Sequence, residues 1–306
     1  MKRLGIKKIS GFHIVNCILM LLVMFVSVYP LYYAIINSLS DGTDILNHGM
    51  VMFWPRVFTL DNWKVVLMDQ AVLSALLITV SRTVIVTVCQ LLFTSMFAYA
   101  FSRSYLVGKR FYVVLGFLSM YVSGGIIATF LLLSRLGLYN SYWVYIIPSL
   151  FGGFYNVIIY TSNYRGIPTE LFESARLDGA SEFSIYFRIV LPLSKAILAA
   201  LAVFTIVGVW NDYNTSLFYT SKDSLQTLQY YIVKIVRNEA AIEQLMTNAS
   251  SMSSSVMELF YQKGSSVTSA TLELAAMVIA AIPMIVIYPF AQKFFSQGML
   301  IGSIKG

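Results

Sequence analysis

The sequence predicts an all-α integral membrane protein with six transmembrane helices. Its 306 residues are 58% hydrophobic and 11% charged, with a mean hydropathy of +0.74. Soluble proteins carry about 25% charged residues, so this composition cannot supply a water-exposed surface. Six apolar runs follow one another, and each approaches or exceeds the roughly 20 residues that a helix needs to cross a bilayer.

The first two runs cover about residues 12–39 and 83–101. The basic segment 1–11 before the first run is typical of a signal peptide, but the run is too long and lacks a small-residue cleavage site. We therefore expect a retained span. A helical lead over residues 71–82 enters the second span, and we expect Arg82 to reach the lipid headgroups by snorkelling.

The third and fourth runs, at about 111–133 and 142–164, each contain helix-bending residues. Pro148 and the glycine pair 152–153 interrupt the fourth run, since proline removes a hydrogen bond donor from a helix. Small residues in the third run allow a bend or the close approach of a neighbouring helix. These residues are Ser123, Gly124 and Gly125.

The last two runs cover about 193–219 and 270–292. They are separated by a polar segment, residues 220–269, that is much longer than most connections between helices. Connections of this length are usually either functional loops or linkers. The segment is therefore a candidate for contact with a partner.

Positive charge fixes the expected orientation. With the N-terminus inside, the inner segments hold thirteen Lys and Arg residues and the outer segments hold seven. Basic residues accumulate on the cytoplasmic side, so both termini are expected there. The result is a cytoplasmic segment 1–11 and one six-span domain over 12–306. This domain has a cytoplasmic loop at 165–192, an extracytoplasmic loop at 220–269 and a cytoplasmic tail at 293–306.

The cytoplasmic loop 165–192 has the local signals of two short helices. Pro168 and Glu170 suit a helix start, because proline has no N–H to lose and an acid meets the positive end of the dipole. Asp178-Gly179 suits a helix end, since glycine accepts the left-handed conformation. Ser181 can cap a second helix, and Pro192 closes the unit. We expect one apolar face on the first helix, formed by Leu171, Phe172 and Ala175.

The loop follows the spacing E-x-A-x(3)-G-x(9)-I-x-L-P, which resembles the EAA loop of ABC importer permeases. Ser174 stands where that family usually has alanine, and it is small enough for the same groove. The resemblance implies that this surface receives the motion of an ATPase. An ordinary cytoplasmic helical hairpin is the alternative. The candidate coupling residues are Glu173, Ser174, Ala175, Asp178, Gly179, Ala180, Ile189, Leu191 and Pro192.

The layout of six spans and the ending from residue 289 to 306 resemble the maltose-type carbohydrate branch of these permeases. Residues 120–127 (MYVSGGII) and 136–141 (LGLYNS) are similar to the subgroup often called LplC-like or YtcP-like. That subgroup is associated with oligosaccharides. Ala128 stands where the subgroup usually has proline. The resemblance covers nearly the whole chain.

The resemblance implies a subunit that works by alternating access in an ATP-driven importer. Its expected partners are a second homologous permease, two ATPase subunits, an extracytoplasmic solute-binding protein that would meet the loop 220–269, and a sugar. The tail is expected to touch the ATPases. ATP and Mg²⁺ would be bound by those partners, and no cofactor is expected in this chain. The protein is placed in a bacterial cell membrane.

A polar segment in the fifth run is the candidate substrate path. A carboxylate such as Asp212 is costly within a span unless it is paired or hydrated. It either lines a path for a hydroxyl-rich solute or braces a neighbouring helix, and the sequence favours the brace slightly. The candidate path residues are Trp210, Asn211, Asp212, Tyr213, Asn214, Ser123, Gly124 and Gly125.

Catalytic and metal sites are not predicted. The chain contains neither G-x(4)-G-K-[ST], the phosphate-binding loop of an ATPase, nor H-E-x-x-H. Cys17 and Cys89 lie singly in apolar runs, and His13 and His48 have no ligand-type neighbours. The net charge of +7 comes largely from basic residues in the expected cytoplasmic segments, so it does not indicate nucleic-acid binding. Two alternatives stay open: an importer of a non-sugar solute, and a membrane sensor or scaffold that does not transport.

Overall fold

The computed structural model describes residues 11–235 and 267–303, and its regular elements there are helices. Most of segment 1–11, much of loop 220–269 and the end of the tail lie outside the described residues. The chain divides into two compact units. One comprises residues 1–69 and 235–281, and the other comprises 70–234 and 282–306.

The first unit contains α1 (Gly11–Ser38), α2 (Gly42–His48) and α3 (Asp61–Met68), together with the start of α16 (Ser269–Ser303). Its polar core is organised by Asn62, which is fully buried. The amide of Asn62 donates to the carbonyl oxygens of Ser38 (3.0 Å) and Ser40 (2.9 Å). Its oxygen accepts from Thr271 Oγ1 at 2.8 Å. One side chain thus joins the end of α1, α3 and the start of α16.

The second unit is built around α4 (Gln70–Ser102), a continuous helix of 33 residues. The predicted lead and second span therefore form one helix. Thirty-three residues make a rod about 50 Å long, at about 1.5 Å per residue. The longest helices packed against it are α8 (Phe154–Arg165) and α12 (Lys195–Asn211).

The third and fourth spans are interrupted where glycine and proline predict it. α5 (Lys109–Tyr121) and α6 (Gly125–Arg135) differ in direction by 114°, and Gly125, the first residue of α6, has φ +72°. In the next span, the helical stretch Trp143–Ser149 meets α8 at 48°. This stretch consists of α7 (Trp143–Ile146) and η1 (Ile147–Ser149).

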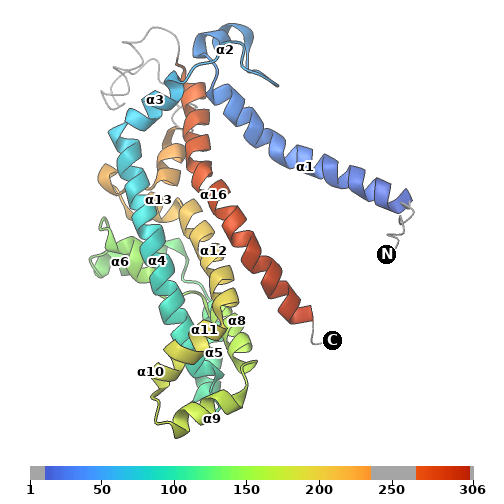
Figure 1. Ribbon diagram of the computed structural model, residues 1–306. Coiled ribbons are helices and arrows are strands. Elements are labelled where there is room, and N and C mark those ends of the chain that lie inside the picture. Colours follow the sequence, from blue (N-terminus) through green and yellow to red (C-terminus); the bar gives the residue numbers. More distant parts are fainter. Residues whose placement is uncertain (1–10, 236–266, 304–306) are drawn as a thin grey trace. The chain divides into compact units, whose positions relative to one another are not determined.

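The cytoplasmic loop predicted at 165–192 folds into short helices that gather at the Ser102 end of α4 (Figure 1). In the next span, α12 ends before a break at Asp212. The helix α13 (Asn214–Tyr219) and the turn η3 (Asp223–Leu225) follow this break. The remaining elements are α9 (Thr169–Leu177), α10 (Glu182–Ile185), η2 (Tyr186–Val190) and α11 (Leu191–Leu193).

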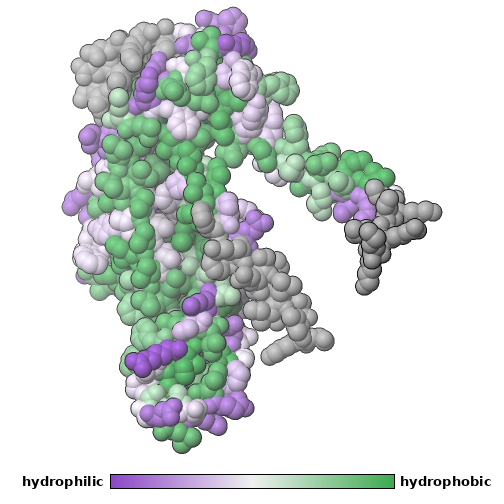
Figure 2. Space-filling view, viewed as in Figure 1, coloured by the Kyte–Doolittle hydropathy of each residue, from purple (hydrophilic) through white to green (hydrophobic). Residues whose placement is uncertain are grey.

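Three helical segments are long and apolar enough to cross a membrane: α1, α4 and Ser269–Pro289 within α16. Counting each bent helix pair as one span raises the number to six among the described residues, as predicted. Hydrophobic side chains cover the visible middle of α4 and α12, and hydrophilic residues gather where α9 and α10 lie (Figure 2). This distribution fits a lipid-facing middle and a water-facing end.

Replacing Asn62 with leucine should destabilise the first unit. Two carbonyl groups and a threonine hydroxyl would lose their buried partner, and one unsatisfied buried polar group costs about 1–3 kcal/mol. Thermal unfolding of the purified protein in mild detergent should show a lower midpoint for Asn62→Leu. Asn47→Leu on the exposed side of α2 is the matched control and should leave the midpoint unchanged. Equal midpoints for the two variants would contradict the role assigned to Asn62.

Candidate functional site

The helix α9 ends as the Asp178-Gly179 pair predicts. Gly179 has φ +76°, a left-handed conformation that favours glycine. Its N–H donates to Arg176 O at 3.0 Å, and the N–H of Ala180 donates to Ala175 O at 2.9 Å. These two bonds form a Schellman motif, which satisfies carbonyl groups at a helix end. The turn between α9 and α10 is therefore fixed by backbone chemistry.

The predicted coupling residues divide between a core-facing and a water-facing set. Phe172 is buried, and Ala175 and Ala180 pack against the core of the second unit. Leu171 is 42% exposed, so its assignment to the same apolar face is wrong. It lies one residue before Phe172, a step of about 100° around the helix that turns it away from the core. Exposed to water are Glu173, Ser174 and Asp178.

The second part of the loop begins at Ser181, whose hydroxyl accepts from the N–H of Ser184 at 3.3 Å and caps α10 as predicted. The helix continues through the π-helical η2 into α11, and Ile189 and Leu191 pack against the same core. Pro192 is exposed within α11. After Ser194 the chain turns by 82° into α12. The coupling loop therefore lies at an angle to the fifth span.

A side-chain clamp joins this loop to α4. Glu182 Oε2 accepts from Tyr99 Oη at 2.6 Å, and Glu182 Oε1 accepts from Arg176 Nε at 3.2 Å. Arg176 Nη2 also donates to Tyr105 Oη at 3.0 Å. Burial alone would raise the pKa of Glu182, but hydrogen bonds from Tyr99 and Tyr105 and the charge of Arg176 hold this pKa below its usual value. Both helices of the coupling loop are thereby fastened to α4 and the loop that follows it.

Arg103 adds an aromatic contact beneath the clamp. Its guanidinium lies 3.9 Å from the ring centre of Phe172 and 4.9 Å from that of Tyr99. Cation–π contacts of this kind hold a charge against an aromatic face without an acidic partner. The sequence did not indicate this clamp, because its members come from three separate segments whose contacts depend on the fold.

The second candidate region is the break between α12 and α13. A helix end leaves carbonyl groups unsatisfied, and little water is available within a membrane. Arg82 of α4 meets this need: Nη2 donates to the carbonyl oxygens of Val209 and Asp212, the latter at 2.6 Å. Nη1 donates to Asp212 Oδ2 at 3.2 Å. The arginine thus caps α12 from a neighbouring helix.

Asp212 also serves the next helix, because its Oδ1 accepts from the N–H of Thr215 at 3.2 Å near the start of α13. Of the two roles considered for Asp212, the structure supports the brace. The expectation that Arg82 snorkels to the headgroups is wrong: its side chain is 2% exposed. The fifth span expected over about 193–219 consists of two helices, α12 and α13, because α12 ends at Asn211.

Tyr145 holds the segment after the break. Its ring lies 5.0 Å from the Arg82 guanidinium, and its hydroxyl donates to Leu225 O (2.7 Å) and is hydrogen-bonded to Ser216 Oγ (3.0 Å). Further along, the N–H of Leu228 donates to Thr79 Oγ1 of α4 at 2.8 Å. The start of the predicted extracytoplasmic loop is thereby tied to α4 by buried hydrogen bonds.

The other predicted path residues occupy exposed or half-buried positions, except Trp210, which is buried. Asn211 and Asn214 are exposed on either side of the break. The small residues of the third span lie at the turn between α5 and α6, where the N–H of Gly125 donates to Ser123 Oγ at 3.3 Å. In the structure, the bend of the third span is thus formed by Ser123, Gly124 and Gly125. The polar break of the fifth span is formed by residues 210–214.

This architecture is that of a membrane permease, and sequence comparison agrees. The family described as "Binding-protein-dependent transport system inner membrane component" matches residues 90–301. The chain belongs to this family. The fold class predicted from the sequence, the all-helical, six-span fold of an ABC importer permease, is confirmed.

Individual relatives resemble nearly the whole chain. "Protein LplC" of Bacillus subtilis (strain 168) is 35% identical and aligns with 92% of this chain and 90% of its own length. "Polygalacturonan/rhamnogalacturonan transport system permease protein YtcP" of the same organism is 32% identical, over 94% and 96%. A solved bacterial ABC transporter involved in the import of the acidic polysaccharide alginate contains a chain with a TM-score of 0.83 and 25% identity, covering 94% and 98%.

A double-mutant cycle should show strong coupling between Arg82 and Asp212. Breaking a buried ion pair by removing one partner costs about 3–5 kcal/mol, because the other charge stays buried. We expect Arg82→Gln and Asp212→Asn each to lower the unfolding free energy, and the double variant to lose much less than their sum.

The control is Arg56→Gln, which removes the exposed pair with Asp44 and should cost less than about 1 kcal/mol. Chemical denaturation in mild detergent measures all four variants. Additive losses at Arg82 and Asp212 would show that the two side chains do not stabilise the break together.

Proposed function

We propose that this protein is a permease subunit of an ATP-driven importer for an acidic oligosaccharide. In this proposal it works by alternating access beside a second, homologous permease. Two ATPase subunits bind its cytoplasmic loop, and an extracytoplasmic binding protein delivers the solute. Both termini lie in the cytoplasm, and ATP and Mg²⁺ are bound by the ATPases.

The carbohydrate substrate is supported by the relatives. A permease named for polygalacturonan and rhamnogalacturonan matches the chain at 32% identity, and the similar solved structure belongs to an importer of acidic alginate. Other relatives are named for arabinooligosaccharides and galactooligosaccharides. Because two of the strongest similarities involve acidic glycans, uronate-containing oligosaccharides are the first substrates to test.

The coupling loop supports the ATP-driven mechanism and is the observation that carries the proposal. Its water-facing set, Glu173, Ser174 and Asp178, is available to a partner, while Phe172 and Ala175 anchor it to the core. The Glu182 clamp fastens the same loop to α4. A push on the exposed side would therefore be transmitted to the membrane helices rather than absorbed by the loop.

The break in the fifth span supports a solute path. Asn211 and Asn214 present exposed amide groups, which donate and accept hydrogen bonds with sugar hydroxyls. Trp210 and Tyr213 supply aromatic rings nearby in sequence. In this proposal Asp212 holds the break in shape, and the asparagines contact the solute.

Co-purification tests the proposed assembly. The tagged protein, expressed in its native host and solubilised in mild detergent, should carry a second permease, an ATPase and a binding protein that mass spectrometry identifies. The recovered binding protein is then titrated with oligogalacturonides, alginate oligosaccharides and neutral arabinooligosaccharides. Preference for a non-sugar solute would replace the substrate class, and recovery of the chain without any ATPase would overturn the importer proposal.

Ala175→Arg should uncouple ATP hydrolysis from uptake in proteoliposomes that contain the whole complex. The half-buried alanine packs against the core, so a long charged side chain there would lift α9 from its seat. We expect ATP hydrolysis without solute accumulation. Ser174→Ala, one residue away, introduces the residue that the family usually has at this position, so it is the control and should transport normally. Normal uptake with Ala175→Arg would contradict the proposed coupling surface.

A further inference from the structure

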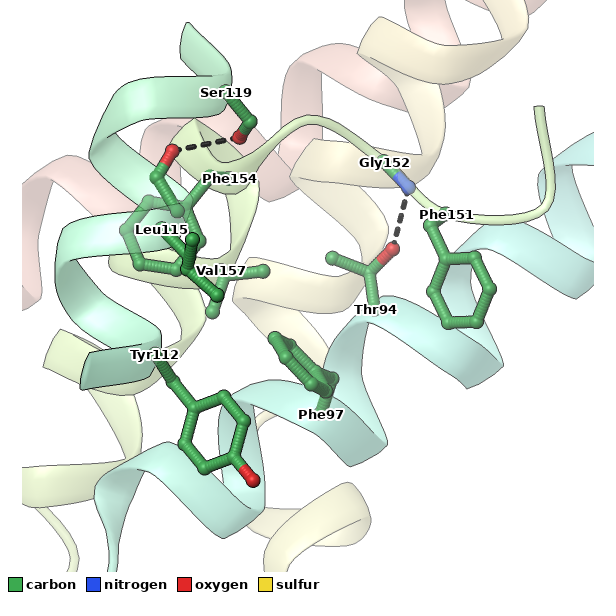
Figure 3. Close-up of a pocket in the computed structure, with 10 residues that line it drawn as sticks. Thr94, Phe97, Tyr112, Leu115, Ser119, Phe151, Gly152, Phe154 and Val157 are labelled. Carbon is green, nitrogen blue, oxygen red and sulfur yellow. Dashed lines mark hydrogen bonds between the residues drawn. The ribbon is translucent and has the colours of Figure 1, made fainter. Parts of the chain in front are cut away.

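An apolar groove of about 390 Å³ lies between α4, α5 and α8 (Figure 3). Aromatic rings dominate its walls, and Tyr112 and Phe97 face the same hollow from α5 and α4. Its polar groups are largely satisfied inside the protein: Thr94 Oγ1 accepts from the N–H of Gly152 at 2.8 Å, and Ser119 Oγ donates to Gly116 O at 2.7 Å. The groove therefore suits an apolar occupant rather than a hydroxyl-rich one.

The same three helices carry basic residues at one common end. Arg103 follows α4, Lys109 begins α5 and Arg165 ends α8. Burial, together with the positive charges of Arg165 and Arg103, lowers the pKa of Lys109. Among the described residues, none of the three forms an ion pair with a carboxylate. Glu182 acts on Arg103 electrostatically, but its two oxygens already accept from Tyr99 and Arg176.

Lys109 is aligned with the groove along α5. Tyr112, Gly116 and Ser119 line the groove at three, seven and ten positions beyond it, which places all four residues on one helix face. Ten residues of helix span about 15 Å. That length equals about half the 30 Å hydrocarbon core of a bilayer. The groove and the basic end beyond it together match the depth of a single leaflet, and the proposed orientation puts the charged end at the leaflet surface.

We propose that this groove binds one anionic phospholipid, with an acyl chain along Tyr112, Leu115 and Ser119 and the phosphate at Lys109 and Arg165. Two unpaired cations complement one phosphate, and basic pockets between membrane helices are a known form of headgroup site. Lys109 Nζ donates to Arg103 O at 3.0 Å, which leaves its other protons for the ligand. Arg103, which is stacked on Phe172, adds its positive electrostatic potential at the proposed headgroup site.

The site is independent of the transported solute, and its placement in the inner leaflet rests on the proposed orientation. The lipid would fill the space between α5 and α8 beside the coupling loop, because Arg103 belongs to both places. Its contact with Phe172 of α9 lies one side chain away from the proposed headgroup site. The lipid would therefore support the seat of α9.

Lipid retention tests the proposal. The full-length protein is placed in nanodiscs of equal parts phosphatidylcholine and phosphatidylglycerol, extracted in mild detergent and examined by native mass spectrometry. We expect one tightly retained phosphatidylglycerol. The double variant Lys109→Gln/Arg165→Gln should weaken this retention roughly 30-fold, since each basic contact contributes about a factor of five.

Two further variants distinguish the contribution of the basic residues to lipid binding from that of the apolar groove. Arg188→Gln/Lys195→Gln removes two exposed basic residues from the same side of the protein and should retain the lipid as the wild type does. Leu115→Trp fills the groove with the cations intact and should also lose the lipid. Equal retention by wild type and Lys109→Gln/Arg165→Gln would overturn the proposal.

Photo-crosslinking identifies the occupant in the assembled complex. A benzoyl-phenylalanine at position 119 should label phosphatidylglycerol. Labelling of the second permease subunit instead would show that a protein helix covers the groove, and this result would also overturn the proposal. Neither readout depends on which solute is transported, so a wrong substrate class and a wrong lipid site give different results.

Discussion

A helix that ends among membrane spans leaves its last carbonyl groups without partners, and at Asn211 one guanidinium reaches them. Arg82 binds two carbonyl oxygens and the Asp212 carboxylate, while Asp212 in turn receives the N–H of Thr215. Both charges are paired and both helix ends are capped, so the chain can change direction there, although the Nε of Arg82 is buried without a hydrogen-bond partner. The exposed asparagines beside the break depend on this arrangement for their position.

The helix α4 connects the two candidate regions. Arg82 and Tyr99 lie seventeen residues apart on it, about 25 Å along its axis. The first holds the break in the fifth span, and the second holds Glu182 of the coupling loop. A continuous helix transmits displacement along its length better than a jointed one. The spans around it are interrupted instead, at Gly125, between α7 and α8, at Ser194 and at Asp212.

The sequence predicted the helices, the glycine and proline breaks and the cap at Gly179, because these depend on residues close together in the chain. The pairing of Arg82 with Asp212 could not be predicted, since 130 positions separate the two residues and only packing joins them. One signal was present: a lone arginine and a lone carboxylate in separate apolar runs each need a partner. The prediction for Leu171 was wrong for a simpler reason: adjacent residues on a short helix can face opposite environments.

The two ends of α4 differ in how dissolved salt should affect them. Arg82 is almost completely shielded from water, so mobile ions approach its pair poorly. The Arg176 and Glu182 side chains are 40% and 45% exposed, and ions screen such pairs readily. Raising the ionic strength should therefore loosen the attachment of the loop 165–192 while leaving the far end of the same helix fixed. The ionic strength would therefore partly determine how rigidly this loop is attached to α4.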